Sequence, residues 1–406
     1  MSVAQVAEQT LSAIRARGTF RHMRLLEGAQ GPRMRAEGRE VLLFAGSNYL
    51  DLSRHPSVVE ACARGARDSG CAAGGSRLIA GNLDLHRALE EELASFLGCE
   101  AALAFSTGYM ANLGVIPALV GAGDSIVSDE LNHASIIDGA RLSRAQVSVF
   151  PHGDVAGLDR CLGEAARSGR RVLLALDGVY SMDGDVAPIA EMVRLARRYG
   201  AMVLLDDAHG TGTLGARGRG SGEHCGVTEG VDVLVGTLGK ALGSFGAFVA
   251  GSQALRTLLV NVARSFIFSC ALAPPQVEAA RAALVLLEAE PWRRWALQCN
   301  AARLRQRLMA AGISTEPSRT HIVPVVIGDN QATMTLCERL LDRGFYAQGI
   351  RHPSVPDGTA RLRLTPMATH TPEEIDALAD AVAKEMALLS VHPARGFEAR
   401  ENDLST

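Results

Sequence analysis

The residue with the most distinctive chemistry in this sequence is Lys240. The chain carries 41 lysines and arginines, and only Lys240 and Lys384 among them are lysines. Lys384 follows Asp380 by four residues in a polar helical pattern, where such a pair stabilises a helix. Lys240 lies instead in the glycine-rich stretch 236–243, directly after the apolar run 231–235. An amine forms an imine and acts as a base once its pKa is lowered, which arginine cannot do. Lys240 is therefore a candidate Schiff-base lysine, and the alternative is a solvated loop lysine.

Asp206 and His209 offer a second piece of chemistry. Asp206 directly follows the apolar run 202–205. A carboxylate at a strand end can pair with a protonated ring nitrogen such as a pyridinium, which an electron-sink cofactor requires. His209 lies three residues further on and could bind a phenolic oxygen. A helix N-cap or a metal pair is the alternative, although no third metal ligand stands at a suitable spacing.

Two further stretches could bind a phosphate and a planar ring. Residues 106–112 follow an apolar run and open a helical pattern, and backbone amides at a helix N-terminus bind phosphate. Thr237, three residues before Lys240, could add a hydroxyl. His133 follows the run 125–128 and could stack on a cofactor ring. Taken singly, these stretches are equally compatible with an ordinary strand-to-helix turn and a structural histidine.

A pattern of short apolar runs predicts the sheet that must position these residues. The runs are 101–105, 125–128, 146–150, 172–176, 202–205 and 231–235, with helical patterns between them. Such alternation predicts an α/β fold with a mostly parallel sheet covered by helices on both faces. Ligands bind beyond the carboxyl ends of the strands in such sheets. Chemically capable residues follow five of the runs, at 106–109, 132–133, 181–183, 206–209 and 237–240, so we expect a single site at that edge.

The length of 406 residues exceeds that of one ordinary domain. The periodicity changes after Pro275, where a long helical stretch interrupted near Pro291 gives way to alternating strands and helices. Thr371 and Glu374 form a capping-box pattern at the start of the last helix. The expected organisation is an N-terminal helix and arm (1–45), a large cofactor-binding domain (46–285), a small C-terminal α/β domain (286–390) and a disordered tail (391–406).

The composition excludes several classes of protein. A net charge of −3 argues against a nucleic-acid or membrane-surface partner. The first 24 residues lack the apolar core of a signal peptide, and no run approaches the ~18 apolar residues of a membrane span. The eight cysteines contain no C-x-x-C pair. We therefore expect no metal site, buried thiols and a cytoplasmic location.

Two nucleotide-binding patterns can be set aside. Residues 210–215 match G-x-G-x-x-G, but that fingerprint requires the glycines straight after a strand and a helix behind them. Here Asp206–His209 intervene, and the glycine- and arginine-rich stretch 216–222 is not expected to be helical. A phosphate-binding P-loop is excluded because Leu234 occupies the position of its first glycine and Ala241 follows the lysine.

Four of these segments together resemble the α-oxoamine synthases, a family of fold-type I pyridoxal-phosphate (PLP) transferases. They are 106–109, 183–185, 206–210 and 237–241, and the likeness covers about residues 44–389. The resemblance implies that Lys240 carries the cofactor imine and moves the substrate's α proton. The other implied roles are pyridinium pairing by Asp206, phenolic-oxygen contacts from His209 and Ser181, stacking of His133 on the ring, phosphate contacts from Gly108, Tyr109 and Thr237, a substrate-lining Asn48, and binding of the amino-acid carboxylate by Arg363.

The resemblance also leaves particular positions open. Arg361 lies beside Arg363 and competes for the carboxylate role. Asp51 stands where relatives often have glycine, and Ser244 and Phe245 replace a smaller pair after the lysine. Both departures bear on the shape of the acyl pocket.

The reaction implied is a decarboxylative Claisen condensation of an amino acid with an acyl-CoA. Segments 264–269, 318–330 and 351–371 are most similar to the branch that joins L-alanine to pimeloyl-CoA or pimeloyl carrier protein in biotin synthesis. That reaction gives 8-amino-7-oxononanoate, CoA and CO2. The distal pimeloyl carboxylate requires a cation, for which Arg21 and Arg24 are candidates. Family members are homodimers with the active site at the subunit interface, so we expect a dimer.

Other functions share part of these motifs. The sister reactions are those of 2-amino-3-oxobutyrate CoA ligase, 5-aminolevulinate synthase, serine palmitoyltransferase or a secondary-metabolite homologue. A PLP aminotransferase is a further alternative and is distinguished by transamination without CoA release. A non-catalytic relative is disfavoured because it has no need of Lys240.

Overall fold

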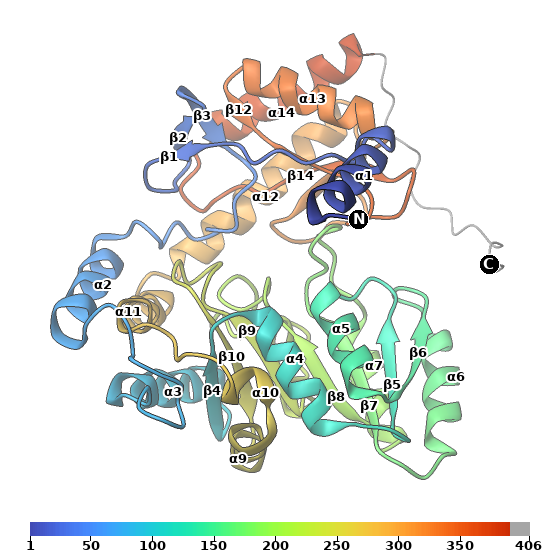
Figure 1. Cartoon of the computed structure of the whole chain (residues 1–406). Coiled ribbons are helices and arrows are strands. Elements are labelled where there is room, and N and C mark those ends of the chain that lie inside the picture. Colours follow the sequence, from blue (N-terminus) through green and yellow to red (C-terminus); the bar gives the residue numbers. More distant parts are fainter. Residues whose placement is uncertain (390–406) are drawn as a thin grey trace. The chain divides into compact units, whose positions relative to one another are not determined.

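The computed structural model describes residues 1–389 and divides the chain into two compact units (Figure 1). The larger unit comprises Ser47–Ser181 and Asp185–Leu297. The smaller unit comprises Met1–Gly46, Met182–Gly184 and the described residues from Gln298 onward. The N-terminal segment thus groups with the C-terminal part of the chain. The sequence-based boundaries at residues 45 and 285 stay predictions, and the predicted tail lies outside the described residues.

The larger unit alternates strands and helices. Its elements are α2 (Pro56–Ser69), α3 (Asp84–Leu97), β4 (Ala101–Phe105), α4 (Gly108–Leu119), β5 (Ser125–Asp129), α5 (Ala134–Ser143), β6 (Gln146–Phe150), α6 (Val155–Ala166), β7 (Val172–Asp177), α7 (Ile189–Arg198), β8 (Met202–Asp206), α8 (Ser221–His224), the 3-10 turn Thr228–Gly230, β9 (Val233–Thr237), β10 (Ala247–Gly251), α9 (Gln253–Val262), α10 (Arg264–Ile267) and α11 (Pro274–Ala289). Helix α12 (Trp292–Ala310) begins in this unit and continues into the smaller one.

The central sheet of the larger unit has the strand order β4-β10-β9-β8-β7-β5-β6. Strand β10 pairs antiparallel with both β4 and β9, whereas the pairs β9–β8, β8–β7, β7–β5 and β5–β6 are parallel. The predicted mostly parallel sheet is confirmed, but the sequence pattern did not indicate β10. This strand follows the glycine-rich turn after Lys240 without a helix between, so it lacks the alternation that revealed the others.

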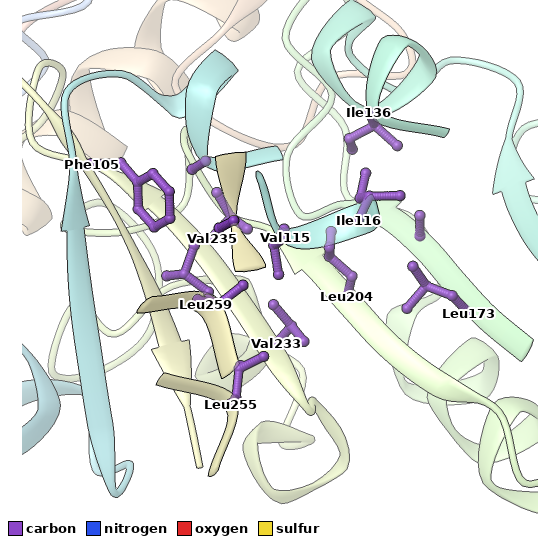
Figure 2. Packing of buried hydrophobic residues seen from close by; sticks show 14 of the residues in the cluster. Phe105, Val115, Ile116, Ile136, Leu173, Leu204, Val233, Val235, Leu255 and Leu259 are labelled. Carbon is purple, nitrogen blue, oxygen red and sulfur yellow. The ribbon is translucent and has the colours of Figure 1, made fainter. Parts of the chain in front are cut away.

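Both faces of the sheet are buried, which explains why its strands are continuous apolar runs. On one face Leu173 and Leu204 pack with Val115 and Ile116 of α4 and with Ile136 of α5 (Figure 2). The alternate residues of the same strands, among them Leu174 and Val203, pack on the other face against α6 and α7. At ~25 cal/mol per Å² of buried apolar surface, these two layers supply the main drive for folding this unit.

Local sequence signals fix the ends of two helices that matter below. Thr107 caps α4 by accepting a hydrogen bond from the Met110 N–H at 3.1 Å. The predicted capping box of Thr371 and Glu374 is confirmed at the start of α14. Residues 216–220 are non-helical as expected, but the four-residue α8 already begins at Ser221. The expectation that 216–222 would be entirely non-helical was therefore wrong at its last two residues.

The smaller unit combines two small sheets with helices. Its elements are α1 (Val3–Ala16), β1 (Leu26–Glu27), β2 (Arg33–Ala36), β3 (Arg39–Leu43), β11 (Val323–Gly328), α13 (Asn330–Asp342), β12 (Phe345–Tyr346), β13 (Gln348–Ile350), β14 (Ala360–Leu364) and α14 (Pro372–Leu388). The strand orders are β1-β2-β3-β12 and β11-β14-β13. An apolar core of residues from α12, α13, α14, β11 and β14 holds the unit together.

The cysteines do not follow the prediction of buried thiols. All eight are free, and Cys337 is buried, whereas Cys71, Cys270 and Cys299 are exposed. A thiol is small and weakly polar, so burial is not required to accommodate it. Within residues 1–389, no helix is long and apolar enough to cross a bilayer, and no group of three or more metal-binding side chains is assembled.

Candidate active site

Five strands of the larger unit end at the same edge of the sheet, and the predicted site residues follow them. Strands β4, β9, β8, β7 and β5 share one direction, so their carboxyl ends meet there. The segments at these ends carry Thr107, His133, Asp206, His209 and Lys240. The structure therefore brings together residues from four separate stretches of sequence, as the strand pattern predicts.

Lys240 is linked to a pair of aromatic side chains. Its Nζ lies 2.9 Å from Nε2 of His209, and Nδ1 of His209 lies 2.7 Å from the hydroxyl of buried Tyr49. When the lysine amine donates to Nε2, the remaining ring proton resides on Nδ1 and is donated to Tyr49. This chain of contacts fixes the orientation of His209 and of the lysine amine.

The two consecutive aspartates at the end of β8 have separate surroundings. Asp206 Oδ2 accepts from Asn112 Nδ2 at 2.6 Å, and Oδ1 accepts from the Ala208 N–H at 3.1 Å. Asp207 is completely buried and accepts both the N–H and the hydroxyl of Ser221, at 2.8 and 2.7 Å. Burial raises the pKa of Asp207 to about 7. Asp206 is thus the carboxylate of the candidate site. Asp207 instead holds the segment after β8 in place through its hydrogen bonds to Ser221.

His133 stands at the N-cap of α5 with its side chain exposed. Its backbone N–H donates to Asp177 Oδ2 at 2.7 Å, and Asp177 lies beside Asp206 in the register of β7 and β8. Burial raises the pKa of Asp177 well above its ordinary value, and the neighbouring Asp206 adds to this effect. Partial desolvation lowers the pKa of His133, a change that Lys240 reinforces and Asp206 opposes. Desolvation and the nearby Lys240 thus favour the neutral imidazole.

The N-terminus of α4 has the features of an anion site. In the described part of the chain, the N–H groups of Gly108 and Tyr109 donate to no protein acceptor. A Cβ placed at Gly108 would meet no atom within 4 Å, so the approach to these amides is open. The Thr237 hydroxyl currently donates to the Gly246 carbonyl at 3.0 Å. Thr237 must therefore exchange this partner before it can bind a phosphate.

Asn48 lies in a tight turn of the larger unit. It is buried, and its Nδ2 contacts Asp51 Oδ1 at 3.3 Å while its Oδ1 accepts the Ser53 N–H at 3.2 Å. Asp51 has a positive φ of 55°, a conformation that favours glycine. Its carboxylate pairs with Arg54 at 2.7 Å. This pairing compensates the negative charge of the buried Asp51 carboxylate.

The predicted substrate-binding arginines belong to the smaller unit. Arg363 lies on β14, as does Arg361, whose guanidinium pairs with Asp183. Arg21 contacts Ser354 Oγ at 3.3 Å, whereas Arg24 pairs with both Glu37 and Glu338. Ser181 is the last residue of the larger unit before the segment Met182–Gly184.

Sequence reasoning missed the supporting residues of the site, namely Tyr49, Asn112, Ser135 and Asp177. Asn112 lies within the stretch 106–112 and Tyr49 follows Asn48, but no spacing signal singles either of them out. Their importance depends on partners 23 to 160 residues away. Only the folded chain reveals them.

The sequence matches the family model of class I and II aminotransferases over residues 39–382. A protein of Citrifermentans bemidjiense named 8-amino-7-oxononanoate synthase is 49% identical over 93% of this chain and 97% of its own length. A protein of the same name from Geobacter sulfurreducens is 50% identical over 92% of this chain and 96% of its own. A variant of the serine palmitoyltransferase from S. paucimobilis, solved with bound PLP and myriocin, has a TM-score of 0.89 at 33% identity and covers 96% of this chain and 98% of its own.

The fold and the residues at its sheet edge define a fold-type I PLP-dependent transferase. The chain belongs to the class I and II aminotransferase family and, within it, to the α-oxoamine synthases. Its residues fit the cofactor. The open amides of Gly108 and Tyr109 suit a phosphate, the Asp206 carboxylate suits a ring N–H, and Lys240 is the amine that an aldehyde requires.

Proposed function

We propose that this enzyme joins L-alanine to a pimeloyl thioester, carried by CoA or by a carrier protein, and releases 8-amino-7-oxononanoate, the free thiol and CO2. This reaction is a step of biotin synthesis. The observation that carries the proposal is the identity of 49–50%, over more than nine-tenths of the chain, to proteins named 8-amino-7-oxononanoate synthase. The arrangement of Lys240, His209 and Asp206 supports it.

When bound, PLP supplies an aldehyde that condenses with amines and a protonated ring that accepts the electrons of a carbanion. Lys240 Nζ holds the cofactor in the resting enzyme, and it then takes the α proton of the amino acid and returns a proton after decarboxylation. His209, 2.9 Å from this amine, and Ser181 bind the phenolic oxygen. Tyr49 keeps the His209 ring in the required orientation through its 2.7 Å contact.

The remaining residues of the larger unit hold the cofactor in place. The Asp206 carboxylate pairs with the ring N–H, which favours the protonated ring that accepts electrons. The exposed ring of His133 stacks on the cofactor. The N–H groups of Gly108 and Tyr109, aided by Thr237, bind the phosphate at the positive end of α4. Asn48 lines the substrate site.

Arg363 is the proposed ligand of the amino-acid carboxylate. The neighbouring Arg361 is almost completely buried and its charge is compensated by Asp183. Releasing Arg361 would leave the Asp183 carboxylate without its cation, which is costly for a largely buried pair. This cost disfavours Arg361 for the role. Arg363 is the other candidate on the same strand, and its planar guanidinium binds a carboxylate through two parallel hydrogen bonds.

Arg21 is the proposed ligand of the distal pimeloyl carboxylate. It lines a cleft of about 330 Å³ in the smaller unit. Arg24 lines the same cleft but already pairs with Glu37 and Glu338. We expect Arg21→Ala to raise the KM for pimeloyl-CoA about tenfold, the loss of one charge-assisted contact, with kcat for a saturating donor unchanged. Arg24→Ala is the matched control, and an equal KM effect from both variants would contradict the assignment.

We further propose that the enzyme is a homodimer with its active site at the interface. Several large apolar side chains of the larger unit are exposed, including Ile79 (85%), Phe268 (72%) and Phe245 (53%). Phe245 follows the glycine-rich turn of Lys240, which places apolar surface next to the site. Light scattering should give twice the chain mass, and a fully active monomer would refute this part of the proposal.

Free thiols at all eight cysteines support a reducing, cytoplasmic location.

Thiol release tests the reaction directly. The purified enzyme is mixed with pimeloyl-CoA and, in turn, with L-alanine, glycine and L-serine, and the free thiol is measured. Release with L-alanine alone supports the proposal. The structural likeness to serine palmitoyltransferase makes L-serine with palmitoyl-CoA the second candidate pair, and release only from that pair would replace the proposed substrates. Conversion of L-alanine to pyruvate without thiol release would indicate an aminotransferase instead.

A further inference from the structure

A chain of buried hydrogen bonds runs from Asp206 to His133 through Asn112 and Ser135. Asn112 on α4 donates from Nδ2 to Asp206 Oδ2 at 2.6 Å and to Ser135 Oγ at 2.9 Å. Ser135 Oγ lies 2.7 Å from His133 Nδ1. Asn112 and Ser135 are 0% and 1% exposed. Solvent therefore does not compete for these bonds, and buried polar networks of this kind define a single arrangement.

The donor and acceptor roles along this chain are fixed. A carboxylate only accepts, so the Asn112 amide must point its NH2 group toward Asp206. The amide oxygen Oδ1 is buried and accepts no hydrogen bond from the described part of the chain, which costs free energy. Turning the amide around would cost more, because Oδ1 would then lie against the Asp206 carboxylate oxygen. The second amide proton goes to Ser135 Oγ. The hydroxyl proton of Ser135 is thus left for His133.

At His133 a backbone N–H group fixes the direction of the hydrogen bond between Ser135 and the ring. The Ser135 N–H donates to His133 Nδ1 at 3.2 Å, and an amide N–H cannot accept. Nδ1 therefore carries a lone pair, which also receives the Ser135 hydroxyl proton. The single proton of the neutral ring must then reside on Nε2.

We infer that Asn112 and Ser135 are positioning residues that connect the Asp206 carboxylate to the His133 ring and hold that ring as its Nε2–H tautomer. The inference deepens the proposed function, because it rests on that function for the roles of Asp206 and His133 at the cofactor. The tautomer is a property of the chain and does not depend on the substrate. One network thus orients both the group that pairs with the cofactor nitrogen and the ring that stacks on it.

The tautomer can be read by ¹⁵N NMR of the full-length holoenzyme labelled at its histidine rings. His133 is assigned from the signal that disappears in His133→Asn. In the wild type we expect Nδ1 at the shift of an unprotonated, hydrogen-bonded nitrogen and Nε2 at that of a protonated one. In Ser135→Ala the backbone N–H of residue 135 remains, but Nδ1 loses its hydroxyl donor. Both shifts should therefore move part of the way toward the tautomer average of a free imidazole. Ser143→Ala is the matched control, because Ser143 is a buried serine of the same helix whose hydroxyl binds only backbone.

Asn112→Leu tests the far end of the network. Asn112 does not contact His133, yet we expect the His133 shifts to move as in Ser135→Ala. The Kd for PLP should rise about tenfold, the typical loss when a hydrogen bond to a charged group is removed. If this variant does not fold, Ser135→Ala still decides the question. A protonated Nδ1 in the wild type, or wild-type shifts in Ser135→Ala, would overturn the inference.

The two proposals can fail separately. Normal thiol release together with a Ser135→Ala spectrum identical to that of the wild type would refute the inference about the network but not the proposed function. The expected spectra without thiol release from any donor would remove the function and leave the network standing.

Discussion

Replacing His152 with glutamine removes the cation that lies between two carboxylates of the larger unit. His152 Nδ1 contacts Asp129 at 3.0 Å, and Nε2 contacts Asp185 at 2.7 Å. The Asp129 side chain is completely buried and that of Asp185 is 11% exposed. Glutamine is close in size but neutral, and it donates from one end only. The two carboxylates then remain in the protein without a cation between them. Removing one partner of a buried ion pair in this way lowers the free energy of unfolding strongly.

The pKa of His152 gives the magnitude. Burial alone would lower it, but hydrogen bonds and charges from Asp129 and Asp185 raise it from 6.5 to about 10. At ~1.4 kcal/mol per pKa unit, this rise corresponds to at most about 5 kcal/mol of stability. Because the imidazole is 19% exposed, solvent screening reduces the figure to ~2–3 kcal/mol. A raised pKa means that this stability is complete below pH 6.5 and disappears as the pH rises through about 10.

The assay is thermal unfolding of the wild type and the variant between pH 6 and pH 10. At ~2–4 °C per kcal/mol for a unit of this size, His152→Gln should lower Tm by about 6 °C at pH 6. The difference should shrink toward pH 10, where the wild-type histidine loses its proton. His224→Gln, at an exposed position of the same unit, is the control and should melt like the wild type. An equal Tm at pH 6, or a difference that does not depend on pH, would refute the reasoning.

The remaining predictions concern the reaction. Lys240→Ala should reduce thiol release by ~10³-fold or more, as deletion of a covalent catalyst does, and Lys240→Arg should not restore it because a guanidinium forms no imine. Asp206→Asn should lower kcat ~10–100-fold, the value of a hydrogen bond to a charged group, as measured by steady-state kinetics; an unchanged kcat would separate Asp206 from the ring nitrogen. Arg363→Lys should raise the KM for L-alanine about tenfold, because lysine cannot bind the carboxylate through two parallel hydrogen bonds. Arg361→Lys should instead lower Tm and leave this KM unchanged. A raised KM in Arg361→Lys with a lowered Tm in Arg363→Lys would exchange the two roles.

Much of the fold follows from periodicity along the chain. Continuous apolar runs such as 172–176 predict strands buried on both faces, and the capping residues of α14 are local signals that the structure confirms. Strand β10 escaped prediction because its antiparallel pairing follows a glycine turn rather than a helix. The exposure of Cys71 was also missed, because this residue lies in the loop between α2 and α3, where no periodicity distinguishes a buried face.

The sequence by itself determined the chemistry available to this protein. A rare lysine in a glycine-rich turn, an aspartate at a strand end and the order of strands and helices are properties of residue type and spacing, so they can be read along the chain. The tertiary structure alone showed that Asp207 is buried and bound to Ser221, whereas Asp206 contacts Asn112. It also decided how Asn112 joins Asp206 to Ser135, across 94 and 23 residues. Such choices depend on burial and on hydrogen bonds between distant segments, and these exist only once the chain has folded.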